Sequence, residues 1–253
     1  MLFSLRLDET NTHVKGGFLT VAGAVASLSQ WDKLEAAWSK KMVAVGADYF
    51  HLKDFDARQS PYSNWTEFKA RRFEDALHKI IWKNTFFRCS VSVDSGVHRA
   101  IKGRMKGIQG FRGDSDYGLC LRYLMFWTCE ELCKHDPDPT LGVIVEDGPY
   151  SAGAAELYQR IVAMQGKWKP AKHAHRLAGF GSLPKGVLRS LEAADLIAGR
   201  EHKRLTSKLE RERATDDVLS IVLDEAKLEE WYSGMMREKD LRRDHYAKTR
   251  LGA

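Results

Sequence analysis

The sequence has few cysteines, and their spacing excludes two classes of protein. Its four cysteines contain no C-x-x-C pair and do not follow a secreted disulfide pattern; they are Cys89, Cys120, Cys129 and Cys133. The spacing therefore argues against a zinc ribbon and against a C-x-x-C redox centre. We expect a reduced protein in the cytoplasm.

Long hydrophobic runs are also missing. The longest apolar stretch runs from Gly17 to Leu28 and has 12 residues, well short of the roughly 20 that a membrane-spanning helix needs. A signal peptide is not expected either, because the chain opens without a charged-then-apolar pattern and reaches an acidic residue at Asp8. We expect no membrane association.

The length and the charge set the next limits. With 253 residues, 43% of them hydrophobic, the chain is long enough to bury a full core in one large domain. The net charge of +6 is consistent with a polyanionic partner, although many proteins with such a charge bind none. Charge alone therefore indicates a nucleic-acid partner only weakly.

Hydrophobic periodicity predicts alternating strands and helices. We expect five strands, at about residues 2–7, 18–28, 86–94, 141–146 and within 173–182. We expect five helices, at about residues 31–45, 66–83, 116–135, 152–164 and 186–205. Ser29 is the expected cap of the first helix, and Gly46 its end. This order predicts an α/β fold with a mixed five-stranded sheet flanked by helices.

Two segments have no clear hydrophobic period. Residues 206–253 are rich in charge and predict a helical C-terminal extension packed on the domain of residues 1–205. Residues 95–115 combine glycines with basic side chains and predict a mobile cationic loop that contacts a phosphate backbone or is simply solvated. The basic residues of this loop are Arg99, Lys102, Arg104, Lys106 and Arg112.

Acidic residues occur where apolar segments would expose a carboxylate. They form four widely separated positions: Asp8-Glu9, Asp54, Glu146-Asp147 and Asp195. Carboxylates gathered at one spot repel each other unless a divalent cation neutralises them, and hard cations prefer oxygen ligands. The pattern therefore predicts a Mg²⁺ or Mn²⁺ site and, in a basic chain, phosphodiester chemistry on nucleic acid.

Several of these residues also have a purely structural explanation. Asp147 precedes Gly148-Pro149, so that a turn accounts for it. Glu192 shares a helix face with Asp195 and is either a further ligand or an ionic partner of Arg189 or Lys185, of which we favour the ion pair. His51 is either a proton shuttle or a packed side chain.

The acidic motifs resemble those of a known family. DET after the first strand, FHLKDF, VEDG and LEAADLIAG, in this order, are similar to the family catalogued as domain of unknown function 3800, grouped with the ribonuclease H-like superfamily. The resemblance spans about Leu5 to Arg204 and implies a ribonuclease H-like fold. The family usually has Ser and Gly after Asp-Glu, whereas this chain has Thr10 and Asn11.

The resemblance implies that Asp8, Glu146 and Asp195 are metal ligands and that Asp147 lies nearby. We therefore predict a metal-dependent nuclease in which these three residues hold Mg²⁺ or Mn²⁺, with Asp147 and Glu192 as further candidate ligands. The candidate substrate contacts are Glu9, Thr10, His51, Lys53, Asp54, Lys102, Arg104, Lys106 and Arg112.

Two alternatives remain open at this point. One is a non-catalytic module on the same fold that binds nucleic acid or a protein. The other is a hydrolase acting on a small phosphorylated molecule. The sequence does not distinguish DNA from RNA as the substrate, nor endonuclease from exonuclease cleavage, and it does not set the oligomeric state.

Overall fold

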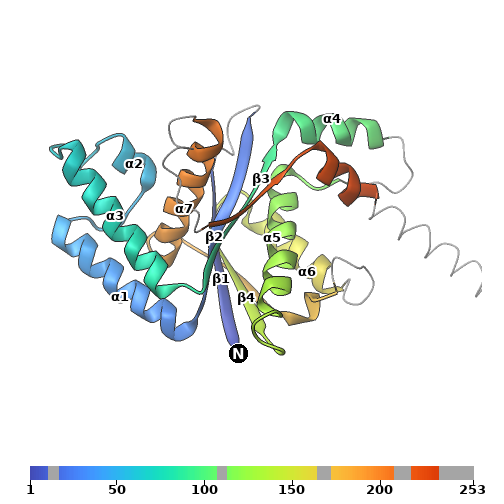
Figure 1. The fold of residues 1–253 in the computed structure, drawn as a ribbon, viewed down its shortest axis with the longest axis horizontal. Helices are drawn as coiled ribbons and strands as arrows, with labels where there is room; N and C mark the ends of the chain where they lie inside the picture. Colours follow the sequence, from blue (N-terminus) through green and yellow to red (C-terminus); the bar gives the residue numbers. More distant parts are fainter. Residues whose placement is uncertain (11–16, 107–112, 164–171, 208–217, 234–253) are drawn as a thin grey trace, which may run out of the picture.

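The computed structural model describes residues 1–10, 17–106, 113–163, 172–207 and 218–233, in which one mixed sheet lies between two layers of helices (Figure 1). The strands are β1 (Leu2–Thr10), β2 (Phe18–Ser27), β3 (Phe87–Asp94), β4 (Thr140–Glu146), β5 (Leu177–Leu183) and β6 (Val218–Leu223). Their spatial order is β5-β4-β1-β2-β3-β6. Strands β1, β2 and β3 are antiparallel neighbours, whereas β4 runs parallel to β1, β5 to β4 and β6 to β3.

This topology confirms the predicted fold class, an α/β protein with a mixed sheet flanked by helices. The expected number of strands was wrong: the described sheet has six strands, because β6 extends it beyond β3. The sequence of β6, VLSIVL, lies in the segment that we expected to be helical, and its β-branched residues suit a strand. Residues 225–233 of the same segment are helical.

Four helices cover one face of the sheet: α1 (Leu28–Val45), α2 (Leu52–Asp56), α3 (Glu67–Asn84) and α7 (Arg189–Thr206) (Figure 1). Their core is rich in aromatic side chains, among them Trp31, Trp38, Phe50 and Phe55, all 2% exposed or less. Helix α2 falls in a stretch for which we predicted neither a helix nor a strand. Its two buried residues, Leu52 and Phe55, supply the apolar side that holds it against this core.

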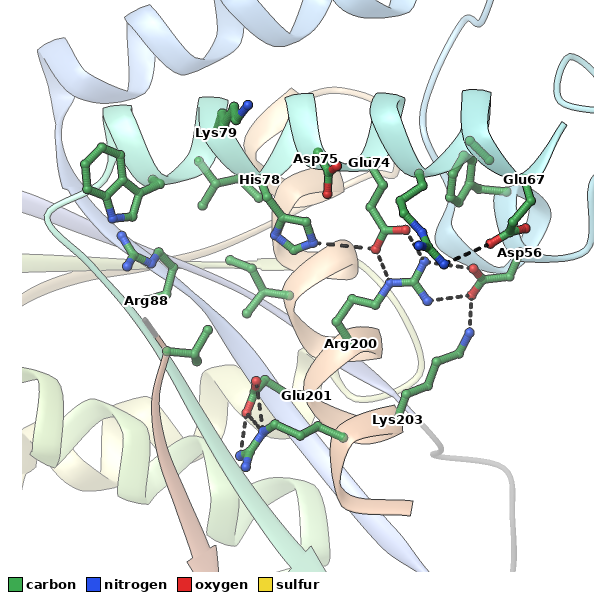
Figure 2. A pocket seen from close by; sticks show the side chains of 18 of the residues that line it. Asp56, Glu67, Glu74, Asp75, His78, Lys79, Arg88, Arg200, Glu201 and Lys203 are labelled. Atoms are coloured by element: carbon green, nitrogen blue, oxygen red, sulfur yellow. Dashed lines mark hydrogen bonds and ion pairs between the residues drawn. The ribbon is translucent and has the colours of Figure 1, made fainter. Parts of the chain in front are cut away.

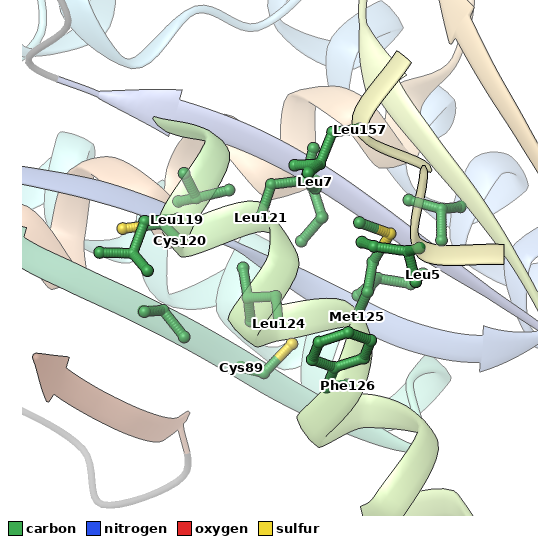
Figure 3. Close-up of a cluster of buried hydrophobic side chains, with 14 of the residues drawn as sticks. Leu5, Leu7, Cys89, Leu119, Cys120, Leu121, Leu124, Met125, Phe126 and Leu157 are labelled. Atoms are coloured by element: carbon green, nitrogen blue, oxygen red, sulfur yellow. The ribbon is translucent and has the colours of Figure 1, made fainter. Parts of the chain in front are cut away.

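The opposite face carries α4 (Ser95–Met105), α5 (Asp116–Leu132) and α6 (Ser151–Ala163) (Figure 1). Figure 3 shows how α5 lays Leu121, Leu124 and Met125 against Leu5 and Leu7 of β1. A short 3₁₀ turn, η2 (Ala174–Arg176), precedes β5. Strand β1 thus has apolar residues on this face, which leaves its alternate positions to point toward α7.

Two helix starts differ from the sequence-based expectation. The cap of α1 is Ser27 rather than Ser29, because Ser27 and Gln30 form a reciprocal capping box. The expected cationic loop begins as helix α4, because the Asp94 carboxylate accepts hydrogen bonds from the Gly96 and Val97 N–H groups. The end of α1 at Gly46, in the left-handed conformation with φ of 69°, is as predicted.

Residues 225–233 pack against the α4–α5 side of the molecule. The ring of Tyr232 stacks on that of His98 at an interplanar angle of 6°, and its hydroxyl lies 2.6 Å from His98 Nε2. His98 Nδ1 lies 2.6 Å from an oxygen of Asp116 at the start of α5. These contacts link the end of the described chain to two helices. Across the described residues, no helix combines the length and the apolar character that crossing a membrane requires.

Candidate metal centre

Asp8 and Glu146 lie side by side at the ends of two neighbouring parallel strands. Leu7 of β1 pairs with Val145 of β4, so that the next residues, Asp8 and Glu146, occupy adjacent positions. Paired residues of parallel strands point to the same face, and neighbouring strands are about 4.8 Å apart. Since Leu7 and Val145 belong to the apolar core on the α5 side, Asp8 and Glu146 point to the α7 side.

Helix α7 brings Asp195 to the same face. The helix is anchored on β1 by Ser190, whose hydroxyl accepts a hydrogen bond from the Arg6 guanidinium. Five residues further along α7, Asp195 Oδ2 accepts a hydrogen bond of 2.8 Å from the N–H of Leu52, the first residue of α2. A side chain at Gly199 would collide with Leu52, so this glycine permits the close approach of α2 to α7.

The carboxylates at this end of the sheet affect one another electrostatically. The pKa of Asp8 is raised well above its usual value, because the carboxyl group is buried and because Asp195, Glu9 and Glu146 add negative charge nearby. Burial, with a contribution from Glu146, raises the pKa of Glu9 to about 7. The three remote acids named from the sequence, Asp8, Glu146 and Asp195, therefore converge on one region.

Two basic side chains, Lys185 and His51, lie near the same carboxylates. Burial raises the pKa of Glu146, while Lys185 and His51 oppose this rise. Burial also raises the pKa of Asp195, while the hydrogen bond from the Leu52 N–H and the nearby His51 and Lys185 partly lower it. Lys185 lies two residues after the end of β5, beside Gly186 at a φ of 79°. In the sequence it was considered only as a partner of Glu192.

His51 is held in a fixed orientation by its neighbour. The Nδ1 atom of His51 lies 3.0 Å from Asp54 Oδ2, and both side chains are about a quarter exposed, at 27% and 28%. The contact follows from the α2 geometry, in which His51 is the cap residue and Asp54 lies in the first turn. The structure thus brings His51 and Asp54 together beside the acids.

Glu192 has a different environment from Asp195. Its Oε2 accepts hydrogen bonds from Trp38 Nε1 at 2.8 Å and from the Phe50 N–H at 2.9 Å, and its Oε1 pairs with Arg189. The side chain is only 2% exposed. Both carboxylate oxygens are therefore engaged, as in the ion pair favoured from the sequence, and we leave Glu192 out of the proposed ligand set.

The other sequence-based candidates lie around this region. Asp147 Oδ1 accepts a hydrogen bond of 2.7 Å from the Ser151 hydroxyl, which closes the turn before α6. Thr10 is half-buried at the end of β1, and Glu9, by strand alternation, points away from the α7 face. Lys53 is exposed on α2.

The basic residues near α4 are largely occupied. Lys102 Nζ donates to the backbone oxygen of Asp114 at 2.7 Å. Arg104 forms ion pairs with Glu225 and Glu229 of the helical segment at residues 225–233. Lys106 is exposed at the end of α4, whereas Arg112 lies outside the described residues.

The carboxylate oxygens of Asp8, Glu146 and Asp195 are suitable ligands for a hard divalent cation, but as placed they are too far apart to share one ion. All the converging ligands are carboxylates, and their raised pKa values show that a nearby positive charge would be favourable. Within the described ranges, no three His, Cys, Asp or Glu side chains stand close enough to hold a metal ion as placed. Metal binding here would require changes of side-chain rotamer.

Comparisons with known proteins give structural matches only. No protein-family model and no curated protein match the chain. Among solved structures it is similar to Bst ribonuclease HIII in complex with Mn²⁺, at 15% identity and a TM-score of 0.44, covering 83% of this chain and 55% of that one. It is also similar to Archaeoglobus fulgidus ribonuclease HII in a complex with PCNA, at 14% identity and a TM-score of 0.37, covering 84% and 79%.

These matches add nothing beyond the fold, and the chain spans little more than half of the ribonuclease HIII chain. We therefore base the function on the geometry of the carboxylates.

Proposed function

We propose that the protein is a divalent-metal-dependent nuclease. The observation that carries the proposal is the convergence of Asp8, Glu146 and Asp195 on one face of the sheet, from β1, β4 and α7. Like charges held together without an equal number of cations destabilise a fold, so their presence needs a functional explanation. We also propose that the chain is a divergent member of the family catalogued as domain of unknown function 3800.

In this proposal Asp8, Glu146 and Asp195 hold the ion. A bound Mg²⁺ or Mn²⁺ would polarise the scissile phosphate and offset the charge that develops on the leaving oxygen. Asp54 fixes the ring of His51, which is then placed to give or take a proton. Lys185 contributes a positive charge beside Glu146 and Asp195, where it favours a phosphate group.

The proposal is tested with single- and double-stranded DNA and RNA in Mg²⁺, Mn²⁺ or EDTA. Asp195→Asn should remove cleavage while the protein stays folded, because the amide oxygen still accepts the Leu52 N–H. Asp147→Asn is the matched control, since its carboxylate serves the Ser151 turn, and it should keep most of the activity. Cleavage that persists in EDTA, or full activity in folded Asp195→Asn, would rule the nuclease out.

Metal binding can be measured without any cleavage reaction, through the melting temperature of the protein. Mn²⁺ should raise the melting temperature of the wild-type protein, because it binds the folded state only, and this rise should vanish in Asp8→Asn. The open arrangement of the carboxylates favours one alternative, a non-catalytic nucleic-acid-binding module on the same fold. Binding of nucleic acid with no metal-induced shift and no turnover would support that alternative.

A further inference from the structure

A concave region lies on the α7 face, and its lining does not include the carboxylates of the proposed metal centre (Figure 2). It is a groove of about 860 Å³ between α3 and the second half of α7, with residues of β3 and β6 among its lining. Its wall residues include Asp56 of α2 and Arg200 and Lys203 of α7, and its floor includes Ile197 and Val218. A volume of this size is typical of a ligand site.

Ion pairs fix the walls at one end of this groove. Arg200 Nη2 lies 2.9 Å from oxygens of both Asp56 and Glu74, and thereby ties α7 to α2 and α3. Lys203 donates to the same Asp56 at 2.6 Å. Figure 2 shows these pairs gathered at the α2 end. Because these charges satisfy one another, this end defines the shape of the groove rather than its ligand.

The opposite end has a different composition. Trp82 lines the groove near the end of α3, yet its side chain is 64% exposed. Lys79, one helical turn earlier on α3, has no carboxylate partner among the residues that the structure describes. Figure 2 shows Lys79 on the side of α3 opposite to Arg88 of β3. An exposed indole beside basic side chains is the combination that stacks on a base and contacts its phosphate.

The sheet register places this groove close to the proposed metal centre. Asp8 pairs with Ala22, and Ala22 pairs with Ser90 of β3. Two strand spacings amount to about 10 Å across the sheet. Ser90 lies within 3.3 Å of Glu201, which lines the groove. Helix α2 lies between the two regions, with Leu52 against Asp195 and Asp56 at the groove.

From these observations we propose that the α3–α7 groove binds single-stranded nucleic acid, with an unpaired base stacked on Trp82 and a neighbouring phosphate on Lys79. The inference rests on the proposed nuclease, because it names the form of its substrate. Unpaired bases expose the π-face that an indole contacts, whereas the bases of an intact duplex are stacked inside it. The groove therefore selects for single strands.

The experiment measures the binding of fluorescently labelled oligonucleotides in EDTA, where cleavage cannot occur. Trp82→Ala should weaken the binding of single-stranded DNA or RNA by about tenfold, since one base stack is lost. Phe68→Ala is the matched control. Phe68 is also on α3 and is 69% exposed, but it lies outside the groove and Arg72 packs on its ring at 5.6 Å.

Further variants separate stacking from charge. Trp82→Phe should restore most of the affinity, and Lys79→Gln should reduce the dependence of binding on salt by about one phosphate contact. Equal affinities of Trp82→Ala and Phe68→Ala would overturn the inference, and so would an equal loss on blunt duplex and single strand. If binding depends on Trp82 but the wild type never cleaves, the groove is a nucleic-acid-binding site and the proposed nuclease activity is wrong. If the wild type cleaves but binding does not depend on Trp82, the proposed role of the groove is wrong and the proposed nuclease activity is unaffected.

Discussion

The two halves of helix α7 place charged side chains in opposite situations. Around Asp195, carboxylates from β1 and β4 gather, and burial raises the pKa of Asp195 itself. Five residues later, Arg200 meets Glu74 and Asp56. There the pKa of Glu74 falls to about 2, because hydrogen bonds from His78 and Arg200 outweigh the effect of burial.

The paired charges around Arg200 stabilise the fold, whereas the carboxylates around Asp195 lower its stability because too few positive charges lie beside them. At the Arg200 end, each buried charge has a partner of opposite sign, so the ion pairs join three helices. At the Asp195 end, the three carboxylates of Asp8, Glu146 and Asp195 outnumber the basic side chains beside them, Lys185 and His51. Carboxylates without matching positive charges are typical of a functional site, whereas the paired charges around Arg200 hold the helices together.

The largest effect on stability is expected from removing the ion pairs that Arg200 forms with Glu74 and Asp56. Arg200→Ala should lower the free energy of unfolding by about 3 kcal/mol, because it leaves the half-buried Glu74 carboxylate, 21% exposed, without its guanidinium. Urea unfolding at pH 7 measures this change. Arg200→Lys should recover only part of it, since an ammonium cannot form the same bidentate contact. A loss below about 0.5 kcal/mol would break the comparison.

A smaller change in the free energy of unfolding, this time a gain in stability, is expected from removing one carboxylate near Asp195. Glu9 has a folded pKa of about 7 against 4.5 when unfolded, so its penalty appears as the pH rises through this range. In EDTA, Glu9→Gln should therefore raise stability at pH 8 by at most about 2 kcal/mol, after allowance for its partial exposure, and change little at pH 4.

The matched control for this pH dependence is Glu74. Its depressed pKa contributes stability above pH 4.5 that is lost as the pH falls toward 2, so Glu74→Gln should destabilise the protein at pH 7 and matter less in acid. Unfolding curves from pH 3 to pH 8 compare the two variants. Parallel pH profiles for Glu9→Gln and Glu74→Gln would show that the two ends of α7 do not differ as described.

The smallest effect is expected from a charge pair on the surface of α6. Arg160 pairs with Glu156 one turn away, and their side chains are 54% and 65% exposed. Arg160→Ala should change the free energy of unfolding by about 0.5 kcal/mol or less, because solvent screens such a pair. Thermal unfolding beside Arg200→Ala measures the contrast. A comparable loss in both variants would mean that burial is not what distinguishes the Arg200 ion pairs.

The sequence predicts the elements whose hydrophobic period is strong. The helices at α1 and α3 and the strand at β3 lie close to their expected bounds, because their apolar residues recur at one spacing. Helix α4 was missed because its glycines disfavour a helix, whereas the Asp94 cap and the buried His98 and Ile101 favour it. Local composition does not reveal such tertiary contacts.

The acids of the site could be named, but their surroundings could not. Asp8 and Glu146 follow apolar segments that the sequence predicts as strands, but the parallel pairing that makes them neighbours is seen only in the structure. Lys185 is brought to them by the chain direction after β5, which no local pattern encodes. The groove at Trp82 depends on how α3 lies relative to α7, and nothing in the period of either helix sets that distance.

Strand β6 has a consequence for how the nascent chain reaches its final form. Arg88 of β3 pairs with Val218, a separation of 130 residues along the chain (218 − 88). A ribosome adds about 5–20 residues per second, so the outer edge of β3 stays open for at least several seconds before β6 is made. An open edge invites pairing with another chain, and polysomes carrying this message bring many such edges together. Slow translation of the last third of the gene would lengthen that interval.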